Sequence, residues 1–457
     1  MRSLLTSIIV IISIPSAAYP DNWPQWRGVS GNGVSTETGL PTRWSKDDIA
    51  WKAPLKGLGV SSPIVWGDRV FVTSQLGQAE LRPGSHPTLA RGPEAAAEKP
   101  MGKGAATAEK GLHFLVEAFR RSDGRLLWEY RVPAEGKLAP VHQKHNLASP
   151  SPVTDGDLVY AWFGNGQLVA VNMEGKLAWQ RHLGKEYSPF EIEWGHGSSP
   201  TLYRDTLILL CDHIPASHLL ALDKKTGKEK WKVDRGKGVR SYSTPTVVRG
   251  PAGDELIVNA SERIDAYDPA TGKHLWYTGE PNRFPIPVPS YENGVLYASR
   301  GYRSGPFMAI RLGGKGDISS THVQWLVPTG APYISSLVHY QGLIYMANDA
   351  GVASCFDAKT GEKVWQSRMD GIFSASPVAG DGKVYLLSET GESIVLKAGR
   401  EMQILARNEL DERMVASPAI SGGQIFIRTD AFLFCIGKKS SGLTQHSRSL
   451  SRSAEQL

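Results

Sequence analysis

A pair of apolar strands joined by a short polar turn returns eight times along the chain. Each copy opens with a small-small-Pro triplet or a close variant of it, as in VSSPIVWGDRVFVTS, SSPTLYRDTLILLC and ASPVAGDGKVYLLSE. The anchor positions of the eight copies are Pro63, Pro152, Pro200, Pro245, Pro289, Leu337, Pro377 and Pro418. After the first gap they lie about 40 to 48 residues apart. A fixed period of this length predicts a repeat architecture in which each unit is one small β-sheet.

A second pattern closes the units with two further strands, the last of them centred on a tryptophan. It reads AVNMEGKLAW, ALDKKTGKEKW, AYDPATGKHLW and CFDAKTGEKVW. In these turns the Asp side chain bonds its own backbone and Gly accepts a positive φ, so a tight hairpin is expected. The tryptophan offers a large flat surface to a neighbouring sheet. The closing positions are Trp128, Trp179, Trp231, Trp276 and Trp365, with Trp325 in the fifth unit and Ile404 as a replacement in the seventh.

Four strands per unit predict an all-β fold, an eight-bladed β-propeller of four-stranded blades. The two ends of the repeat array complement each other. The last unit stops after FLFCIG without a Trp strand, and the segment DDIAWKAPL before the first unit supplies a spare one through Trp51. We therefore expect the N-terminal Trp51 strand to complete the last blade, because this closes the ring and removes an exposed sheet edge.

The repeat text resembles the pyrroloquinoline-quinone (PQQ) repeat of the quinoprotein alcohol dehydrogenase-like superfamily, with the outline SSP…VYxxxxxxLxALDxxTGKxxW. The opening NWPQWRG…GVS…LPTRWSKDDIAWK is similar to the start of exported PQQ-binding-like propellers without assigned function. The resemblance covers roughly Asn22 to Lys438. It implies the propeller fold. It implies no single activity, because the superfamily includes both quinone-dependent enzymes and the propeller lipoprotein of the outer-membrane assembly machine.

The first residues, MRSLLTSIIVIISIPSAAYP, have the layout of a secretory signal peptide, with a short apolar run and small residues before a cleavage site after Ala18. We expect residues 1–18 to be this signal and the mature chain to be periplasmic or secreted, without a membrane span. Residues 19–438 would form the propeller as a single domain, with a flexible insertion at 77–111 in its first blade. The Ser-rich residues 439–457 would be a disordered tail.

The net charge of +6 is concentrated outside the repeats. Without Arg2 and the basic end of the chain, the folded part carries a net charge of about +2, which is too small to indicate nucleic-acid binding. The three cysteines, Cys211, Cys355 and Cys435, stand in apolar strand text with no CxxC and no adjacent pair. Buried free thiols are therefore expected. We expect a monomer.

Loop length separates the two faces of the predicted ring. The turns within strand pairs are mostly short, whereas the blade-to-blade connections and the turns between second and third strands are long and polar, and both open on one face. Long loops on a rigid scaffold usually carry binding residues. Residues just before each triplet, or just after the second strand, should lie nearest the central channel. The candidate ligand-binding residues are His145, Asn146, His196, Asp212, His213, Arg240, Glu262, Arg263, Arg300, Tyr302, Arg303, Asn348 and Glu389.

These residue types are compatible with three roles. Metal-ligating types stand at His145, His196, Asp212 and His213. No fixed-spacing metal motif accompanies them, so no metal site is predicted. A carboxylate, a phosphate or a sugar-like ligand could be held by bidentate bonds and stacking from Arg240, Arg300, Arg303 and Tyr302. The third role is structural, in which these polar groups cap strand ends and bond backbone amides.

The sequence favours an exported, non-catalytic propeller that binds a protein, peptide or glycan through its long-loop face. The alternative is a PQQ-dependent dehydrogenase. In relatives that bind the quinone, the resemblance implies an adjacent-cysteine disulfide against the cofactor, with Asp and Glu as base and calcium ligand. This chain has no Cys-Cys pair and those carboxylates have no assignable positions, so PQQ with Ca²⁺ is unsupported as a cofactor. A polysaccharide-acting hydrolase or lyase that uses the His and Arg residues is a further alternative.

Overall fold

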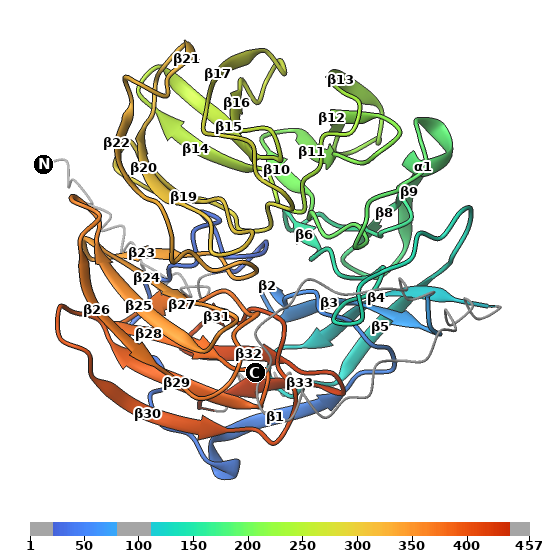
Figure 1. The fold of residues 1–457 in the computed structure, drawn as a ribbon. Coiled ribbons are helices and arrows are strands. Elements are labelled where there is room, and N and C mark those ends of the chain that lie inside the picture. The colour runs from blue at the N-terminus through green and yellow to red at the C-terminus, as the bar shows by residue number, and fades with distance from the viewer. Residues whose placement is uncertain (1–21, 80–110, 439–457) are drawn as a thin grey trace, which may run out of the picture.

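The computed structural model describes residues 22–79 and 111–438, which form a closed ring of small sheets (Figure 1). The predicted signal peptide, most of the predicted insertion at 77–111 and the predicted tail lie outside these residues. Within the described part of the chain, no helix is long and apolar enough to cross a membrane.

Eight sheets follow one another along the chain, each built from one sequence repeat, and we number these blades 1 to 8. Their strands pair antiparallel in chain order, except that blade 8 takes one strand from the N-terminal part of the chain. Blade 1 contains β2 (Ile64–Trp66), β3 (Arg69–Leu76), β4 (His113–Arg120) and β5 (Leu126–Pro133). Blade 2 contains β6 (Val153–Thr154), β7 (Leu158–Trp162), β8 (Gln167–Asn172) and β9 (Leu177–His182). Blade 3 contains β10 (Thr201–Tyr203), β11 (Thr206–Cys211), β12 (Ser217–Asp223) and β13 (Glu229–Gly236). Blade 4 contains β14 (Thr246–Gly250), β15 (Gly253–Asn259), β16 (Ile264–Tyr267) and β17 (His274–Thr278).

The second half of the ring repeats this arrangement. Blade 5 contains β18 (Ser290–Glu292), β19 (Val295–Ser299), β20 (Phe307–Arg311) and β22 (Val323–Val327). Blade 6 contains β23 (Val338–Tyr340), β24 (Leu343–Ala347), β25 (Val352–Asp357) and β26 (Lys363–Arg368). Blade 7 contains β27 (Val378–Gly380), β28 (Lys383–Leu387), β29 (Glu392–Lys397) and β30 (Ile404–Glu409). Blade 8 contains β31 (Ala419–Ser421), β32 (Gln424–Arg428), β33 (Phe432–Ile436) and β1 (Ile49–Pro54). The short strand β21 (Gly316–Asp317) adds to the edge of blade 4, and the helices η1 (Lys46–Asp48) and α1 (Leu183–Glu186) are single turns.

The ring closes as the sequence predicts. Strand β1 pairs antiparallel with β33, with Trp51 opposite Cys435. The buried side chain of Arg428 in blade 8 then bonds across to blade 1, where its guanidinium donates to Ser61 Oγ at 2.6 Å and Ser74 Oγ at 3.0 Å. The eight-bladed, four-stranded propeller with its last blade closed by the Trp51 strand is therefore confirmed.

The core lies between blades rather than within one. All six residues of β11 are buried, whereas the rim strand β13 alternates between exposed and half-buried positions. Both faces of an inner strand meet the apolar surface of a neighbouring blade, which explains continuous apolar runs such as TLILLC. One such cluster joins Tyr160 and Trp162 of blade 2 to Leu207 and Leu209 of blade 3.

The rim tryptophan of one blade packs on the turn glycine of the next. Trp179 of blade 2 lies against Gly227 of blade 3, where an added Cβ would come within 2.7 Å of the indole, and its Nε1 donates to Lys224 O at 3.0 Å. The same contact pairs Trp51 with Gly124, Trp128 with Gly175, Trp231 with Gly272 and Trp325 with Gly361. The repeated Thr-Gly-Lys text is therefore an inter-blade contact as well as a turn.

The residue opposite each rim tryptophan is small. It is alanine in most blades and cysteine in two, with Cys355 opposite Trp365 and Cys435 opposite Trp51. In blade 7 the hairpin between β29 and β30 is one residue longer than that of blade 6. Ala406 rather than Ile404 therefore occupies the tryptophan slot, opposite Val395, and the prediction of Ile404 is wrong by two positions. All three cysteines are buried and free of disulfides, as expected.

Residues 22–44 cross the end of the central channel before the chain enters β1. Trp23 pairs with Val65 of blade 1, and Ser35 N donates to Ala379 O of blade 7 at 2.8 Å. Between them Arg27 is only 1% exposed and donates to Leu337 O of blade 6 at 2.7 Å. Burial lowers the pKa of Arg27 to about 9. This segment, drawn in blue within the ring in Figure 1, ties opposite sides of the propeller together, and no sequence pattern predicted it.

Candidate functional site

A pocket of about 220 Å³ opens at the centre of the ring, and all eight blades contribute to its wall. The residue three positions before each repeat anchor lines it in every blade: Val60, Ser149, Gly197, Tyr242, Ile286, Ile334, Ser374 and Val415. These positions belong to the blade-to-blade connections, so the pocket lies on the predicted long-loop face. The sequence rule that residues just before the triplet lie nearest the channel therefore holds.

A ring of hydroxyl groups surrounds this pocket. The middle residue of the triplet accepts a hydrogen bond from the corresponding backbone N–H of the preceding blade, as in Ser62 N to Ser151 Oγ at 2.9 Å and Ser151 N to Ser199 Oγ at 2.9 Å. Further bonds of the same kind join Ser199 to Thr244, Val288 to Ser336, Ser336 to Ser376 and Ser376 to Ser417. Each of these hydrogen bonds contributes about 1 kcal/mol to stability, so joining neighbouring blades is enough to explain the hydroxyl group in the triplet.

Trp26 of the crossing segment forms the floor of the pocket. It lines the central pocket together with residues of all eight blades, and it also lines a separate cavity with Gln25, Val29 and Gly31 of its own segment. Its Nε1 donates to Ser417 Oγ of the hydroxyl ring at 3.3 Å. The indole therefore lies between the two cavities, together with Ser199 and Thr244, which also line both.

One side of the pocket is a chain of aromatic rings contributed by successive blades. The ring centroids of Trp194 and Phe284 lie 6.2 Å apart, and those of Phe284 and Tyr302 lie 5.2 Å apart, both pairs in edge-to-face geometry. The ring centroids of Tyr302 and Tyr333 lie 5.6 Å apart, and those of Tyr242 and Phe284 lie 6.3 Å apart. Ring pairs in this geometry add about 0.5–1.5 kcal/mol beyond the area they bury. The chain is thus a pre-formed apolar surface from blade 3 to blade 6.

Phe284 is held in a backbone conformation that bulky residues avoid. Its φ is 53°, a left-handed value that costs about 1–3 kcal/mol for such a side chain. The neighbouring bonds enforce it, because Asn282 N donates to Ser261 O at 2.6 Å and Tyr242 N donates to Pro285 O at 2.9 Å. Strain of this kind gathers at binding sites, where the surroundings fix a side chain in one position.

The polar part of the pocket mouth is an ion pair between distant repeats. Lys144, which lines the pocket before blade 2, donates to Glu389 Oε1 of blade 7 at 2.9 Å. Ser374 Oγ also donates to this carboxylate. Beside Lys144, His145 bonds Ser149 Oγ at 2.9 Å and the carbonyl of Trp194. Burial lowers the pKa of His145, so its ring is neutral at neutral pH.

A second, charged pocket adjoins the first. It is lined by Glu193, Arg240, Ser261, Glu262, Pro281, Asn282, Arg283 and Phe284. Phe284 belongs to both pockets, and Glu193 and Trp194 are neighbours in sequence that line one each. Arg240 Nε pairs with Glu193 Oε1 at 2.8 Å. The predicted residues Arg240 and Glu262 are therefore brought together here.

Two of the predicted histidines are enclosed in the protein. His196 is 1% exposed, lies 4.3 Å from the ring of Trp162 and bonds Ser198 O at 3.1 Å. His213 is fully buried, with the ring of Phe190 at 4.3 Å. Burial lowers the pKa of each to about 3. Among the described residues no group of three or more His, Cys, Asp or Glu side chains is arranged to hold a metal ion.

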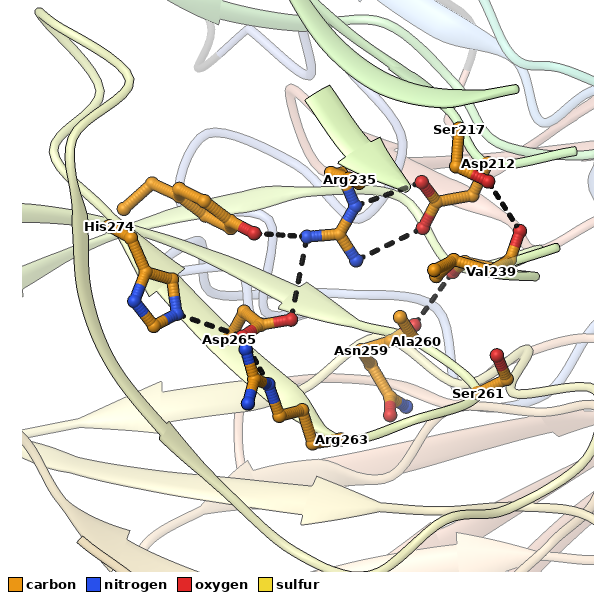
Figure 2. A network of polar contacts seen from close by, with 12 residues as sticks. Asp212, Ser217, Arg235, Val239, Asn259, Ala260, Ser261, Arg263, Asp265 and His274 are labelled. Atoms are coloured by element: carbon orange, nitrogen blue, oxygen red, sulfur yellow. Dashed lines mark hydrogen bonds and ion pairs between the residues drawn. The ribbon is translucent and has the colours of Figure 1, made fainter. Parts of the chain in front are cut away.

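Asp212 belongs to a buried network between blades 3 and 4 (Figure 2). Arg235 binds it with two bonds, Nε to Oδ1 at 2.9 Å and Nη2 to Oδ2 at 3.1 Å, and reaches Asp265 Oδ2 at 3.4 Å. Asp265 also accepts from Arg263 Nε at 2.8 Å and His274 Nε2 at 2.9 Å. The predicted residues Asp212 and Arg263 thus both serve this inter-blade contact.

The remaining predicted residues stabilise local structure or are exposed to solvent. Arg300 is buried and donates to Ala260 O at 2.8 Å and Glu280 O at 3.2 Å, and burial lowers its pKa to about 10. Asn146 and Asn348 shape turns through their side-chain oxygens, at 2.9 Å from Ala148 N and Val352 N. Arg303 is exposed, with its guanidinium 5.3 Å from the ring of Tyr302.

Sequence reasoning missed the pocket's aromatic residues. Trp26, Trp194, Tyr242, Phe284 and Tyr333 line the cavity, yet the candidates were chosen among polar side chains. A usable signal existed, because Tyr242 stands three positions before an anchor, as the lining residue of every other blade does.

The residues present do not fit the quinone arrangement that the resemblance implies. Cys211, Cys355 and Cys435 lie in strands of blades 3, 6 and 8, so no pair of them forms a disulfide against the pocket. No carboxylate is among the lining residues of the central pocket within the described chain.

The sequence profile of a family described as outer membrane protein assembly factor BamB matches residues 34–188, 112–351 and 348–456. The chain belongs to this family. Tetrathionate hydrolase of Acidithiobacillus ferrooxidans is 24% identical over 358 residues, which are 74% of this chain and 64% of that protein. The chain thus spans less than two thirds of the length of this curated relative.

Solved structures agree on the family's fold. BamB from Moraxella catarrhalis superposes with a TM-score of 0.52 at 13% identity, over 79% of this chain and 99% of that one. A europium-containing methanol dehydrogenase gives 0.64 at 11% identity over 89% of both chains. The quinohemoprotein alcohol dehydrogenase of Comamonas testosteroni gives 0.63 at 12% identity, over 92% and 81%. These matches confirm the expected PQQ-repeat propeller and do not choose among its activities.

Proposed function

We propose that this chain is an exported, non-catalytic propeller that binds a ligand or a segment of a partner in the central pocket of its long-loop face. The observation that carries the proposal is the pocket itself, which all eight blades line and Trp26 closes from below. Its chemistry is that of a recognition site, with an apolar aromatic wall and a few fixed polar groups. The N-terminal signal-like sequence supports export.

Two functions compete with simple binding. The match to tetrathionate hydrolase favours hydrolysis of a sulfur oxyanion as a second candidate, with Lys144 as a cation at the pocket. The likeness to alcohol dehydrogenases is a likeness of fold only.

The test is a thermal-shift screen of the purified chain with oligosaccharides, peptides, tetrathionate and PQQ with Ca²⁺, because a ligand that binds only the folded state raises Tm. Each ligand that binds is then incubated with the protein and analysed by mass spectrometry. We expect a ligand to raise Tm in the wild type but not in Trp194→Ala, and to be recovered unchanged. Consumption of tetrathionate, or dye reduction dependent on PQQ, would refute the non-catalytic function.

A further inference from the structure

The two adjoining pockets differ in chemistry but share a wall. The central pocket is aromatic, with Trp194 and Phe284 on one side, while the second pocket is lined by charged and amide side chains on the other side of Phe284. The second pocket has a volume of about 360 Å³. A ligand that fills both must offer an apolar face to the rings and several hydroxyl or amide groups to the planar polar side chains.

Charges of both signs surround the two pockets, and most of them are paired. The lining cations are Lys144, Arg240 and Arg283, the lining anions are Glu193 and Glu262, and Glu389 pairs with Lys144 at the mouth. Two of each are already paired, Lys144 with Glu389 at 2.9 Å and Arg240 with Glu193 at 2.8 Å. An anion drawn to Lys144 or Arg240, or a cation drawn to Glu389 or Glu193, would have to compete with an existing partner, whereas a neutral ligand leaves both pairs intact.

We propose that the two pockets together bind a neutral oligosaccharide, with one sugar ring against the Trp194–Phe284 wall and the next in the Arg240–Glu262 pocket. Sugar rings present apolar C–H faces that pack on aromatic rings, and their hydroxyls bond carboxylate, guanidinium and amide groups. This inference rests on the proposed binding function and names its ligand class.

Phe284 is the specificity-determining residue of this arrangement because it forms a wall of both pockets. Because its φ is 53°, one substitution can remove the ring and the backbone strain together. Phe284→Gly removes the ring and also removes the backbone strain, since glycine adopts this conformation freely. A large loss of binding in a variant whose Tm changes little would therefore separate ligand contact from folding.

The experiment is isothermal titration of the purified chain with neutral mono- and tetrasaccharides of glucose, N-acetylglucosamine, galactose and mannose. We expect a tetrasaccharide to bind at least about tenfold more tightly than its monosaccharide, because only the longer ligand reaches both pockets. In Phe284→Gly affinity should fall at least about tenfold, while Tm falls only slightly, because the backbone strain that is removed offsets part of the lost ring contacts. Between about 50 and 500 mM NaCl, Kd should change less than about twofold, as for an uncharged ligand.

Two control variants accompany it. Glu262→Gln, in the second pocket, should weaken tetrasaccharide binding but not monosaccharide binding at the aromatic wall. Glu174→Gln, an exposed carboxylate in the β8–β9 turn, should change neither.

The proposal is overturned if no saccharide binds, if Phe284→Gly binds as the wild type does, or if affinity falls steeply with salt. If an aromatic peptide or tetrathionate raises Tm through Trp194 while every saccharide fails, the oligosaccharide is wrong and the binding function of the pocket stands. If no probe depends on Trp194 or Phe284, both fail.

Discussion

Neighbouring blades are joined in two different ways: by a contact that most blade pairs repeat, and by an ionic network that one pair adds to it. We call the contact between two neighbouring blades a seam. At the outer rim most seams repeat one contact, in which a tryptophan packs on a turn glycine, as Trp179 does on Gly227. The seam between blades 3 and 4 adds a buried ionic network around Arg235 that no other blade copies among the described residues. The repeated contact packs an indole on a glycine and contains no buried charge. The unique one depends on every partner being present, because a buried charge is costly when left alone.

The largest expected effect comes from breaking the unique network. Asp212→Ala removes both short bonds to a carboxylate and leaves the buried guanidinium of Arg235 with the Tyr267 hydroxyl and the longer contact to Asp265, so we expect the free energy of unfolding to fall by about 3–5 kcal/mol. Urea titration followed by tryptophan fluorescence measures this loss. Asp205→Ala removes an exposed partner of Lys230 and should leave the free energy of unfolding nearly unchanged. Equal losses in the two variants would show that burial of the pair has no special weight.

A smaller effect is expected from the repeated seam, where two glycines form a matched pair. Gly227 and Gly382 both have φ of +70°, but an added Cβ meets Trp179 at 2.7 Å in the first and open space in the second. Gly382→Ala should cost about 1 kcal/mol for the backbone strain alone. Gly227→Ala should cost about 2–4 kcal/mol, because the indole must also move. Equal unfolding midpoints would assign the glycine to the turn and not to the seam.

Counted for a single residue, the smallest of the three effects is a pH dependence of the contact between blades 2 and 3. His196 and His213 have pKa values of about 3 in the folded protein, below the value of about 6.5 in an unfolded chain. The unfolded state therefore binds more protons between these values, and stability falls as the pH drops through this window. At about pH 4.5 each histidine should cost about 2–3 kcal/mol relative to pH 7. Thermal melts of His196→Gln should show a flatter pH profile, and an unchanged slope would contradict the assignment.

Much of the scaffold is predictable because its determinants are local and repeated. The anchors from Pro63 to Pro418 recur at a fixed spacing, and the missing Trp strand of the last unit matches the spare one at Trp51. The shift from Ile404 to Ala406 shows the limit of this reasoning, since the hairpin between β29 and β30 is one residue longer than that of blade 6 and moves the register without changing the hydrophobic pattern.

The candidate site was predictable in position but not in composition. His145 lines the central pocket and Glu389 pairs with Lys144 at its mouth, whereas Asp212 and Arg300, predicted by the same rule, are enclosed between blades. A polar residue at the end of a strand can turn toward the channel or toward the next blade, and the sequence carries no sign of which.

The sequence by itself determined the number of blades, their four strands and the ring closure, because these follow from hydrophobic period and turn chemistry. Only the tertiary structure decided which side chains meet on the axis. Trp26 reaches the pocket from a segment outside the repeats, and Lys144 meets Glu389 across 245 positions of chain. Such contacts depend on how the closed ring brings distant loops to one centre, and no local pattern encodes that distance.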